Sequence, residues 1–197
     1  MAITAKMVSE LRSRTGAGIM DCKQALTETE GDVDAAIKKL REQGLKASEV
    51  KGGRATEEGL IISYIHPGNR VGTMVELNCE TDFVARTEQF QKLATEIAMQ
   101  VAAAKPRYVK EDDVPAEELD AEKTILKTQA LQEGKPDHIV DKIVQGRLSK
   151  FYSEACLLKQ PYIRDADKTI EDLVKDAIAQ LGENIVVKRF VLYVLGQ

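Results

Sequence analysis

The chain has 197 residues, of which 43% are hydrophobic and 30% charged, and its net charge is −4. This predicts a globular protein of one domain plus a small module, and argues against direct nucleic-acid binding, which needs a concentrated basic field. We expect no membrane span, because no apolar run is long enough, and no signal or transit peptide; the sparse cysteines favour reduced thiols in the cytoplasm.

Residues 1–45 carry the patterns of three short helices. Thr4 can cap the first, the TGAG stretch at 15–18 breaks it, and Gly31-Asp32 precedes the third, which Gly44 is expected to end in a left-handed cap. Helices this short must share one core. The size and the loop glycines resemble ubiquitin-associated bundles, which are docking modules. The polar, glycine-bearing segment 46–58 then predicts a linker, helical at most in its first turn.

The core is expected to fill residues 59–197 and to begin with a β-hairpin over 60–79. Two β-branched runs are joined there by a PGNR turn signal. Alternate residues of the second run, from Val71 to Cys79, share one face, so Cys79 is expected to be a small buried hydrophobe. His66, beside the turn, is expected to be exposed.

The stretch ELNCETDFVARTEQF, residues 76–90, joins the hairpin to a predicted helical region over 82–105. Thr81 or Asp82 can cap this region through a short side-chain oxygen. Phe83 is harder to place, because a cap does not need an aromatic neighbour. If the corner is purely structural, Phe83 packs back on the sheet.

Two further helical patterns, separated by Gly134-Lys135-Pro136, predict an antiparallel helical hairpin over about 115–156. Residues 160–163 are expected to form a loop, and 168–195 a helix followed by a strand that joins the sheet. That last strand is apolar on both faces, so it needs cover on both sides or a partner. The predicted fold class is therefore α+β, with a small antiparallel sheet packed with helices.

The sequence lacks the common motifs for nucleotide binding, metal binding and thiol catalysis. The sequence contains no GxxxxGK[ST], HExxH or CxxC pattern, and its two histidines and three cysteines are scattered. The acidic run at 110–122 is typical of a solvated helix start, and His138 of a surface residue. We expect no enzyme activity, no catalytic residues, no cofactor and no metal site.

Three segments resemble one known family. They are TDFVA after a strand ending in LNCE, LRSRTGAGIMDCKQALTE at 11–28, and KIVQGRLSKFYSEACLLKQPYI at 142–163. These are similar to segments of bacterial elongation factor Ts, the nucleotide-exchange factor of the GTPase elongation factor Tu. The resemblance implies that this chain binds elongation factor Tu with GDP and promotes GDP release. It also implies that the helical hairpin matches the family's coiled-coil arm.

The resemblance assigns roles to particular residues. It places displacement of the partner's Mg²⁺ on Thr81, Asp82, Phe83 and Val84, with the outer two supporting the corner. Lys23, otherwise an ordinary exposed helix lysine, matches a lysine on the face that meets the GTPase.

The chain resembles the short form of the family, which lacks a second core half, so we expect a homodimer through the C-terminal strand. Two other classes of function remain open. The three-helix bundle could make the chain a non-catalytic adaptor, with Asp82 and Phe83 purely structural. More weakly, Cys22, Cys79 or Cys156 could serve a thiol redox protein.

Overall fold

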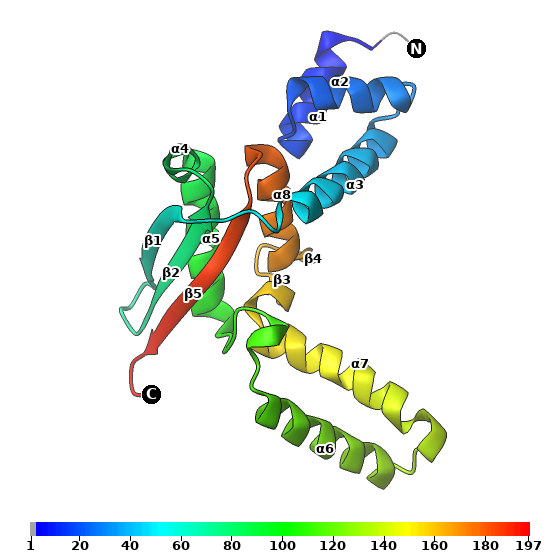
Figure 1. The fold of residues 1–197 in the computed structure, drawn as a ribbon, viewed down its shortest axis with the longest axis vertical. Helices are drawn as coiled ribbons and strands as arrows, with labels where there is room; N and C mark the ends of the chain where they lie inside the picture. The colour runs from blue at the N-terminus through cyan, green and yellow to red at the C-terminus, as the bar shows by residue number, and fades with distance from the viewer. Residues whose placement is uncertain (1–2) are drawn as a thin grey trace. The chain divides into compact units, whose positions relative to one another are not determined.

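The computed structural model describes residues 3–197, and for Leu45, Ala47, Glu49 and Asp137 it describes the backbone alone. It confirms the α+β class: helices accompany an antiparallel sheet of strand order β1-β2-β5 and a smaller sheet of β3 and β4 (Figure 1). The chain forms two compact units. The first holds the described residues up to Leu60, together with Leu77–Leu93 and Asp172–Val186. The second holds Ile61–Glu76, Ala94–Glu171 and Val187–Gln197.

The first unit begins with the predicted three helices. They are α1 (Ala5–Thr15), α2 (Ile19–Glu28) and α3 (Val33–Lys51). Each helix contributes to one shared core, whose buried members are Val8, Leu11, Cys22, Ala25, Leu26 and Ala36. The first two residues of the predicted docking module lie outside the described part of the chain.

Three ends of helices in this bundle are formed by the residues that the sequence predicts. The Thr4 hydroxyl accepts the N–H of Met7 at 3.3 Å. Gly16 ends α1 with φ of 69°, a left-handed conformation that costs glycine little. The Asp32 carboxylate accepts the N–H groups of Asp34 and Ala35, both at 3.0 Å. Local hydrogen bonding and glycine conformation therefore set both ends of α1 and the start of α3.

The expected end of α3 was wrong. The helix runs through Gly44 to Lys51, into the segment expected to be a linker. A Cβ on Gly44 would lie 3.1 Å from the Ala179 side chain, so this glycine permits a close approach and does not form a cap. The division into a docking module at 1–45, a linker at 46–58 and a core at 59–197 stays a prediction.

The predicted hairpin consists of β1 (Glu58–Ile65) and β2 (Val71–Cys79). Its turn has Gly68 at φ of 93° and a hydrogen bond of 3.0 Å from the N–H of Asn69 to the carbonyl of His66. Pro-Gly at the two central positions is the pattern of a type II turn. The face expected to be buried on β2 is buried at Thr73, Val75, Leu77 and Cys79.

The helical region expected over 82–105 is two helices, α4 (Asp82–Ala85) and α5 (Glu88–Ala104). Thr87 interrupts it. Its hydroxyl donates to the carbonyl of Val84 at 2.8 Å and accepts the N–H of Phe90 at 3.2 Å. A hydroxyl that bonds to neighbouring backbone in this way competes with continuous helix.

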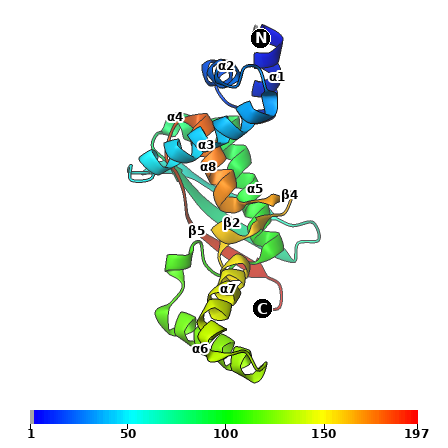
Figure 2. The ribbon, with the colours of Figure 1, turned by 90° about the vertical axis from the view of Figure 1, so that its right-hand side faces the viewer.

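The second unit contains the helical hairpin that the sequence predicts. Its helices are α6 (Ala116–Gln132) and α7 (Asp137–Ala155), preceded by the 3₁₀ turn η1 (Glu111–Asp113). Figures 1 and 2 both show α6 and α7 side by side. Their seam is apolar, with Leu126, Ala130, Val140, Val144 and Leu148 buried.

One expectation after the hairpin was wrong. Residues 160–163 are not simply a loop, because after the 3₁₀ turn η2 (Leu157–Lys159) the strand β3 (Pro161–Tyr162) pairs with β4 (Asp165–Thr169). The buried Gln100 amide holds this segment by donating to the carbonyl of Pro161 at 3.1 Å and accepting the N–H of Ile163 at 2.9 Å. The chain then forms α8 (Ile170–Leu181) and β5 (Ile185–Val194). Within residues 3–197, no helix combines the length and apolar character needed to cross a membrane.

Candidate functional site

The corner between β2 and α4 carries the four residues singled out by the sequence. β2 ends at Cys79, and Thr81 is the N-cap of α4, with extended dihedrals of −131° and 154°. The Thr81 hydroxyl accepts the N–H of Val84 at 3.4 Å, so the expected capping role of threonine is present. Thr81, Asp82 and Val84 are each half-buried.

Phe83 differs sharply from the other aromatic residue nearby. Phe83 is 80% exposed, whereas Phe90, one helix later, is fully buried. The structural interpretation, in which Phe83 packs back on the sheet, is therefore wrong for the free protein. A large exposed aromatic residue is a common anchor of protein–protein interfaces.

Asp82 lies beside Phe83 in the single turn of α4. Its carboxylate makes an ion pair with Arg86 at 2.8 Å, and both side chains are substantially exposed. Such an exposed pair contributes only about 0–1 kcal/mol. Asp82 is therefore available to exchange Arg86 for another partner at little cost.

The backbone of this corner is held by a residue that sequence reasoning did not identify. Glu183 Oε2 accepts the N–H groups of Glu80 at 3.1 Å and Thr81 at 2.9 Å. Glu183 Oε1 accepts the Thr81 hydroxyl at 2.6 Å. Glu183 follows Thr81 by 102 positions in the chain, and no local pattern announces the contact.

A second carboxylate makes the reverse connection. Glu80 Oε1 accepts the N–H of Asn184 at 2.7 Å, and the guanidinium of Arg54 lies 3.4 Å from the same oxygen. The Asn184 amide in turn donates to the carbonyl of Arg54 at 2.9 Å. Hydrogen bonds to ionised groups are stronger than neutral ones, so the corner is firmly attached at its base.

The thiols of the chain are poorly placed for redox chemistry. Cys22, Cys79 and Cys156 are free and buried. Burial raises the pKa of Cys79, and the nearby Glu183 carboxylate raises it further. Burial also raises the pKa of Cys156, to about 11. The reactive species is the thiolate, so both residues are held in their unreactive form.

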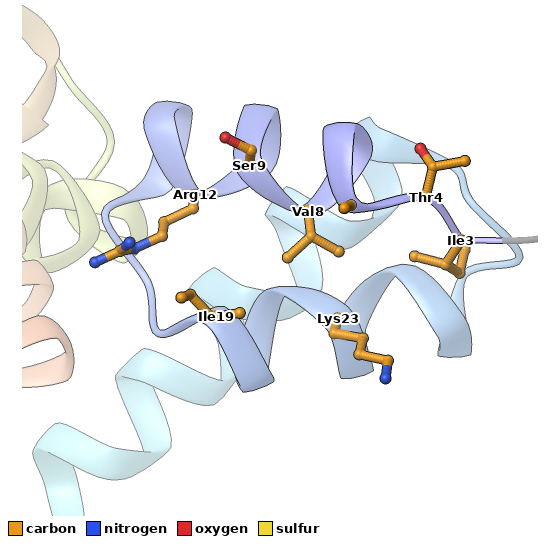
Figure 3. A pocket seen from close by; sticks show the side chains of 8 residues that line it. Ile3, Thr4, Val8, Ser9, Arg12, Ile19 and Lys23 are labelled. Atoms are coloured by element: carbon orange, nitrogen blue, oxygen red, sulfur yellow. The ribbon is translucent and has the colours of Figure 1, made fainter.

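Lys23 belongs to a second candidate site, within the three-helix bundle. It is exposed on α2 and lines a hollow of about 390 Å³. Figure 3 shows Val8 of α1 pointing toward α2, on which Ile19 and Lys23 lie. The hollow has an apolar floor and is flanked by the cationic side chains of Arg12 and Lys23. Such a surface suits an amphipathic, acidic segment of a partner.

The histidines and acidic residues form no metal centre over the described part of the chain, where no group of three or more His, Cys, Asp or Glu side chains is placed to hold an ion. His66 is exposed, as expected, and its Nδ1 lies 3.0 Å from the Tyr64 hydroxyl. His138 is exposed as well.

The fold and this corner define an α+β protein that presents an acidic-aromatic pair on a strand-to-helix turn held at its base by carboxylate hydrogen bonds. The profile of the family described as "Elongation factor TS" matches residues 3–197. Curated relatives named elongation factor Ts match equally broadly. The relative from Caldanaerobacter subterraneus subsp. tengcongensis is 57% identical over 99% of this chain and 98% of its own length. Those from Desulfitobacterium hafniense and Thermoanaerobacter sp. are 58% and 56% identical over 99% of this chain, and over 90% and 96% of their own lengths. The chain belongs to the elongation factor Ts family, a family of translation elongation factors.

Proposed function

We propose that this chain is a guanine-nucleotide exchange factor, which binds elongation factor Tu carrying GDP and accelerates GDP release. The observation that carries the proposal is the exposure of Phe83, 80% of whose surface faces solvent. Membership of the elongation factor Ts family supports the choice of partner.

The thermodynamics of such exchange follow from linkage. An exchange protein that lowers the partner's affinity for GDP must bind the nucleotide-free partner more tightly than the GDP-bound partner. The ratio of these two affinities equals the ratio by which GDP affinity falls. The contact that distinguishes the two states has to be available on the free factor. Phe83 meets this requirement, because its ring makes few contacts that would have to be broken first.

The step that Phe83 and Asp82 promote is displacement of the partner's Mg²⁺ and its surroundings. Mg²⁺ requires near-ideal octahedral geometry and retains several waters, so a small movement of the groups around it weakens its binding. The Phe83 ring enters beside these groups, and Asp82, leaving Arg86, disturbs their hydrogen bonds. Thr81 and Val84 keep α4 in place. The factor contributes no catalytic chemistry and needs no cofactor of its own.

Lys23 and the hollow of the bundle provide a second contact with the GTPase. This contact adds affinity and a favourable electrostatic attraction, which acts mainly on the association rate. Separate docking and displacing sites would let the chain remain bound while Mg²⁺ and GDP leave. The free, buried cysteines support a reducing compartment, and we place the chain in the cytoplasm.

We also propose a homodimer through the C-terminal strand. In the second unit, exposed apolar side chains line two adjoining hollows on the strands β1, β2 and β5 and the residues just after β5; they are Ile61, Ile65, Met74, Val191, Tyr193 and Leu195. Clusters of exposed apolar residues of this kind mark association surfaces. A two-fold pairing of the same surface would cover both copies, and two-fold dimers are the commonest oligomers.

The proposed function is tested with elongation factor Tu loaded with a fluorescent GDP. We expect the purified chain, in catalytic amounts, to accelerate release of the label in the presence of excess unlabelled nucleotide. A pull-down with the same GTPase accompanies the measurement. Binding with an unchanged GDP off-rate would overturn the exchange proposal in favour of an adaptor. Absence of binding would overturn the exchange proposal and the adaptor role for this GTPase.

A further inference from the structure

The side chain of Phe83 has little around it to fix its direction. It is 80% exposed, and α4, from which it projects, has four residues. A helix of one turn is not stable by itself. The direction in which Phe83 leaves the protein is therefore set by the groups that hold the ends of α4.

At the N-terminal end of α4, those groups are two carboxylates arranged reciprocally. Glu183, placed by the left-handed Gly182 (φ of 80°) that ends α8, binds both backbone N–H groups of Glu80 and Thr81 and the Thr81 hydroxyl. Glu80 binds the backbone N–H of Asn184. We call Glu80 and Glu183, with the backbone groups they bind, the carboxylate clasp.

The Glu183 half of the clasp acts directly on the cap of α4. Because the Thr81 hydroxyl donates its hydrogen to Glu183, its lone pair is directed toward the N–H of Val84. The carboxylate thus orients the backbone at Thr81 and the capping oxygen together. A carboxylate is well suited to this, since it only accepts hydrogen bonds and can accept several at once.

We propose that Glu183 is a positioning residue for nucleotide exchange: through the clasp it holds Phe83 and Asp82 in the orientation that displaces the partner's Mg²⁺. This inference rests on the proposed exchange function. Glu183 itself does not touch the partner's metal or nucleotide. Its loss leaves the docking surface around Lys23 intact and lets the corner turn away from its productive direction.

The central test separates the maximal rate from the concentration dependence of exchange. For Glu183→Ala we expect the maximal rate of GDP release at saturating factor to fall on the order of tenfold. The half-saturating concentration should stay within about twofold, because docking is unaffected. Partial unfolding of the variant would have the opposite effect. It would lower the concentration of active protein, which raises the apparent half-saturating concentration and leaves the maximal rate of GDP release unchanged.

Two variants control this result. Glu57→Ala removes another carboxylate, an exposed one just before β1 and outside the clasp, and should leave both parameters unchanged. Glu183→Gln should recover part of the maximal rate, because its amide oxygen can still accept the backbone N–H groups. It also serves as the test should Glu183→Ala fail to fold. A folded Glu183→Ala variant with an unchanged maximal rate, or with a change in half-saturation alone, would overturn the proposal; if Glu183→Ala does not fold, the same outcomes in Glu183→Gln would overturn it.

Dependence on Phe83 gives a second, independent criterion. If Glu183 acts through Phe83, the two substitutions are strongly non-additive. We expect Glu183→Ala to produce a much smaller further loss in a Phe83→Ala background, because only the orientation of Asp82 is then left to be lost. A further loss of the same factor in that background would mean that Glu183 acts elsewhere, and would overturn the inference.

A measurement on the free protein distinguishes failure of the clasp from failure of the proposed function. The sequence contains no tryptophan, so Phe83→Trp introduces a single indole at the corner. We expect Glu183→Ala to lower the fluorescence anisotropy of that indole, and Glu57→Ala to leave it unchanged. If Glu183→Ala and Glu57→Ala both left the anisotropy of the Phe83→Trp protein unchanged, Glu183 would not have the positioning role. If the unsubstituted chain did not accelerate GDP release from elongation factor Tu, the proposed exchange function would be wrong. The anisotropy measurement would still decide whether the clasp holds the corner.

Discussion

Replacement of Phe83 by alanine separates a packing role from a recognition role. Full burial of a phenylalanine contributes about 1.5–3 kcal/mol. Phe83 is 80% exposed, so only one fifth of that, roughly 0.3–0.6 kcal/mol, is at stake. For a chain of this length a loss of 1 kcal/mol lowers Tm by about 2–4 °C. We therefore expect Phe83→Ala to lower Tm by about 2 °C or less.

The matched comparison is Phe90→Ala, which truncates the same residue type at a fully buried position. Truncation of a buried phenylalanine costs about 3–5 kcal/mol. The corresponding fall in Tm is roughly 6–20 °C. A fall of that size for Phe83→Ala would refute the reasoning from exposure.

The same preparations are then assayed for GDP release from elongation factor Tu. Phe83→Ala should lose most of the acceleration, on the order of tenfold or more, while remaining folded. Val50→Ala, which removes a comparably exposed apolar side chain on α3, should retain it. A stable Phe83→Ala variant with full exchange activity would end the hypothesis that Phe83 displaces the partner's groups.

Three further predictions concern other parts of the chain. Lys23→Glu should weaken binding of the GTPase mainly by making association slower and less dependent on salt. Lys38→Glu, on the exposed face of α3, should leave association unchanged. Equal association rates for the two variants, measured by stopped flow, would show that Lys23 is not in the interface. Tyr193→Asp, which puts a charge on the open sheet face, should convert a dimer into a monomer by light scattering; a monomer before substitution would already contradict the homodimer. Burial and the hydrogen bond to Glu96 raise the pKa of Tyr162 from 10.0 to about 12, so its contribution to stability is complete below pH 10 and lost as pH rises through 12. Tyr162→Phe should remove that part of the alkaline destabilisation, seen as a flatter dependence of Tm on pH in this window.

The corner illustrates how far a local pattern can be interpreted. The change of periodicity after Cys79 predicted the strand-to-helix junction, and Thr81 was recognisable as a cap. Whether Phe83 faces the core or solvent could not be predicted, because a residue beside a junction fits both patterns. The break at Thr87 was missed for a related reason: a threonine inside a helical pattern can continue the helix or interrupt it by bonding to its backbone.

What the sequence by itself determined is local: the three bundle helices, the β1-β2 hairpin, the α6-α7 hairpin, the last helix and strand, the caps at Thr4 and Asp32, and the buried face of β2. These features depend on periodicity and on side chains within a few positions of the backbone they bind. Only the tertiary structure decided that Gly44 allows a close approach, that Phe83 stands in solvent, and that Glu183 holds a corner 102 positions earlier in the chain. Such contacts arise only when segments distant in the sequence pack together. A glutamate that accepts two backbone N–H groups from a distant segment is flanked by the same kinds of residues as a glutamate that points into water, so its neighbours in the sequence do not distinguish the two.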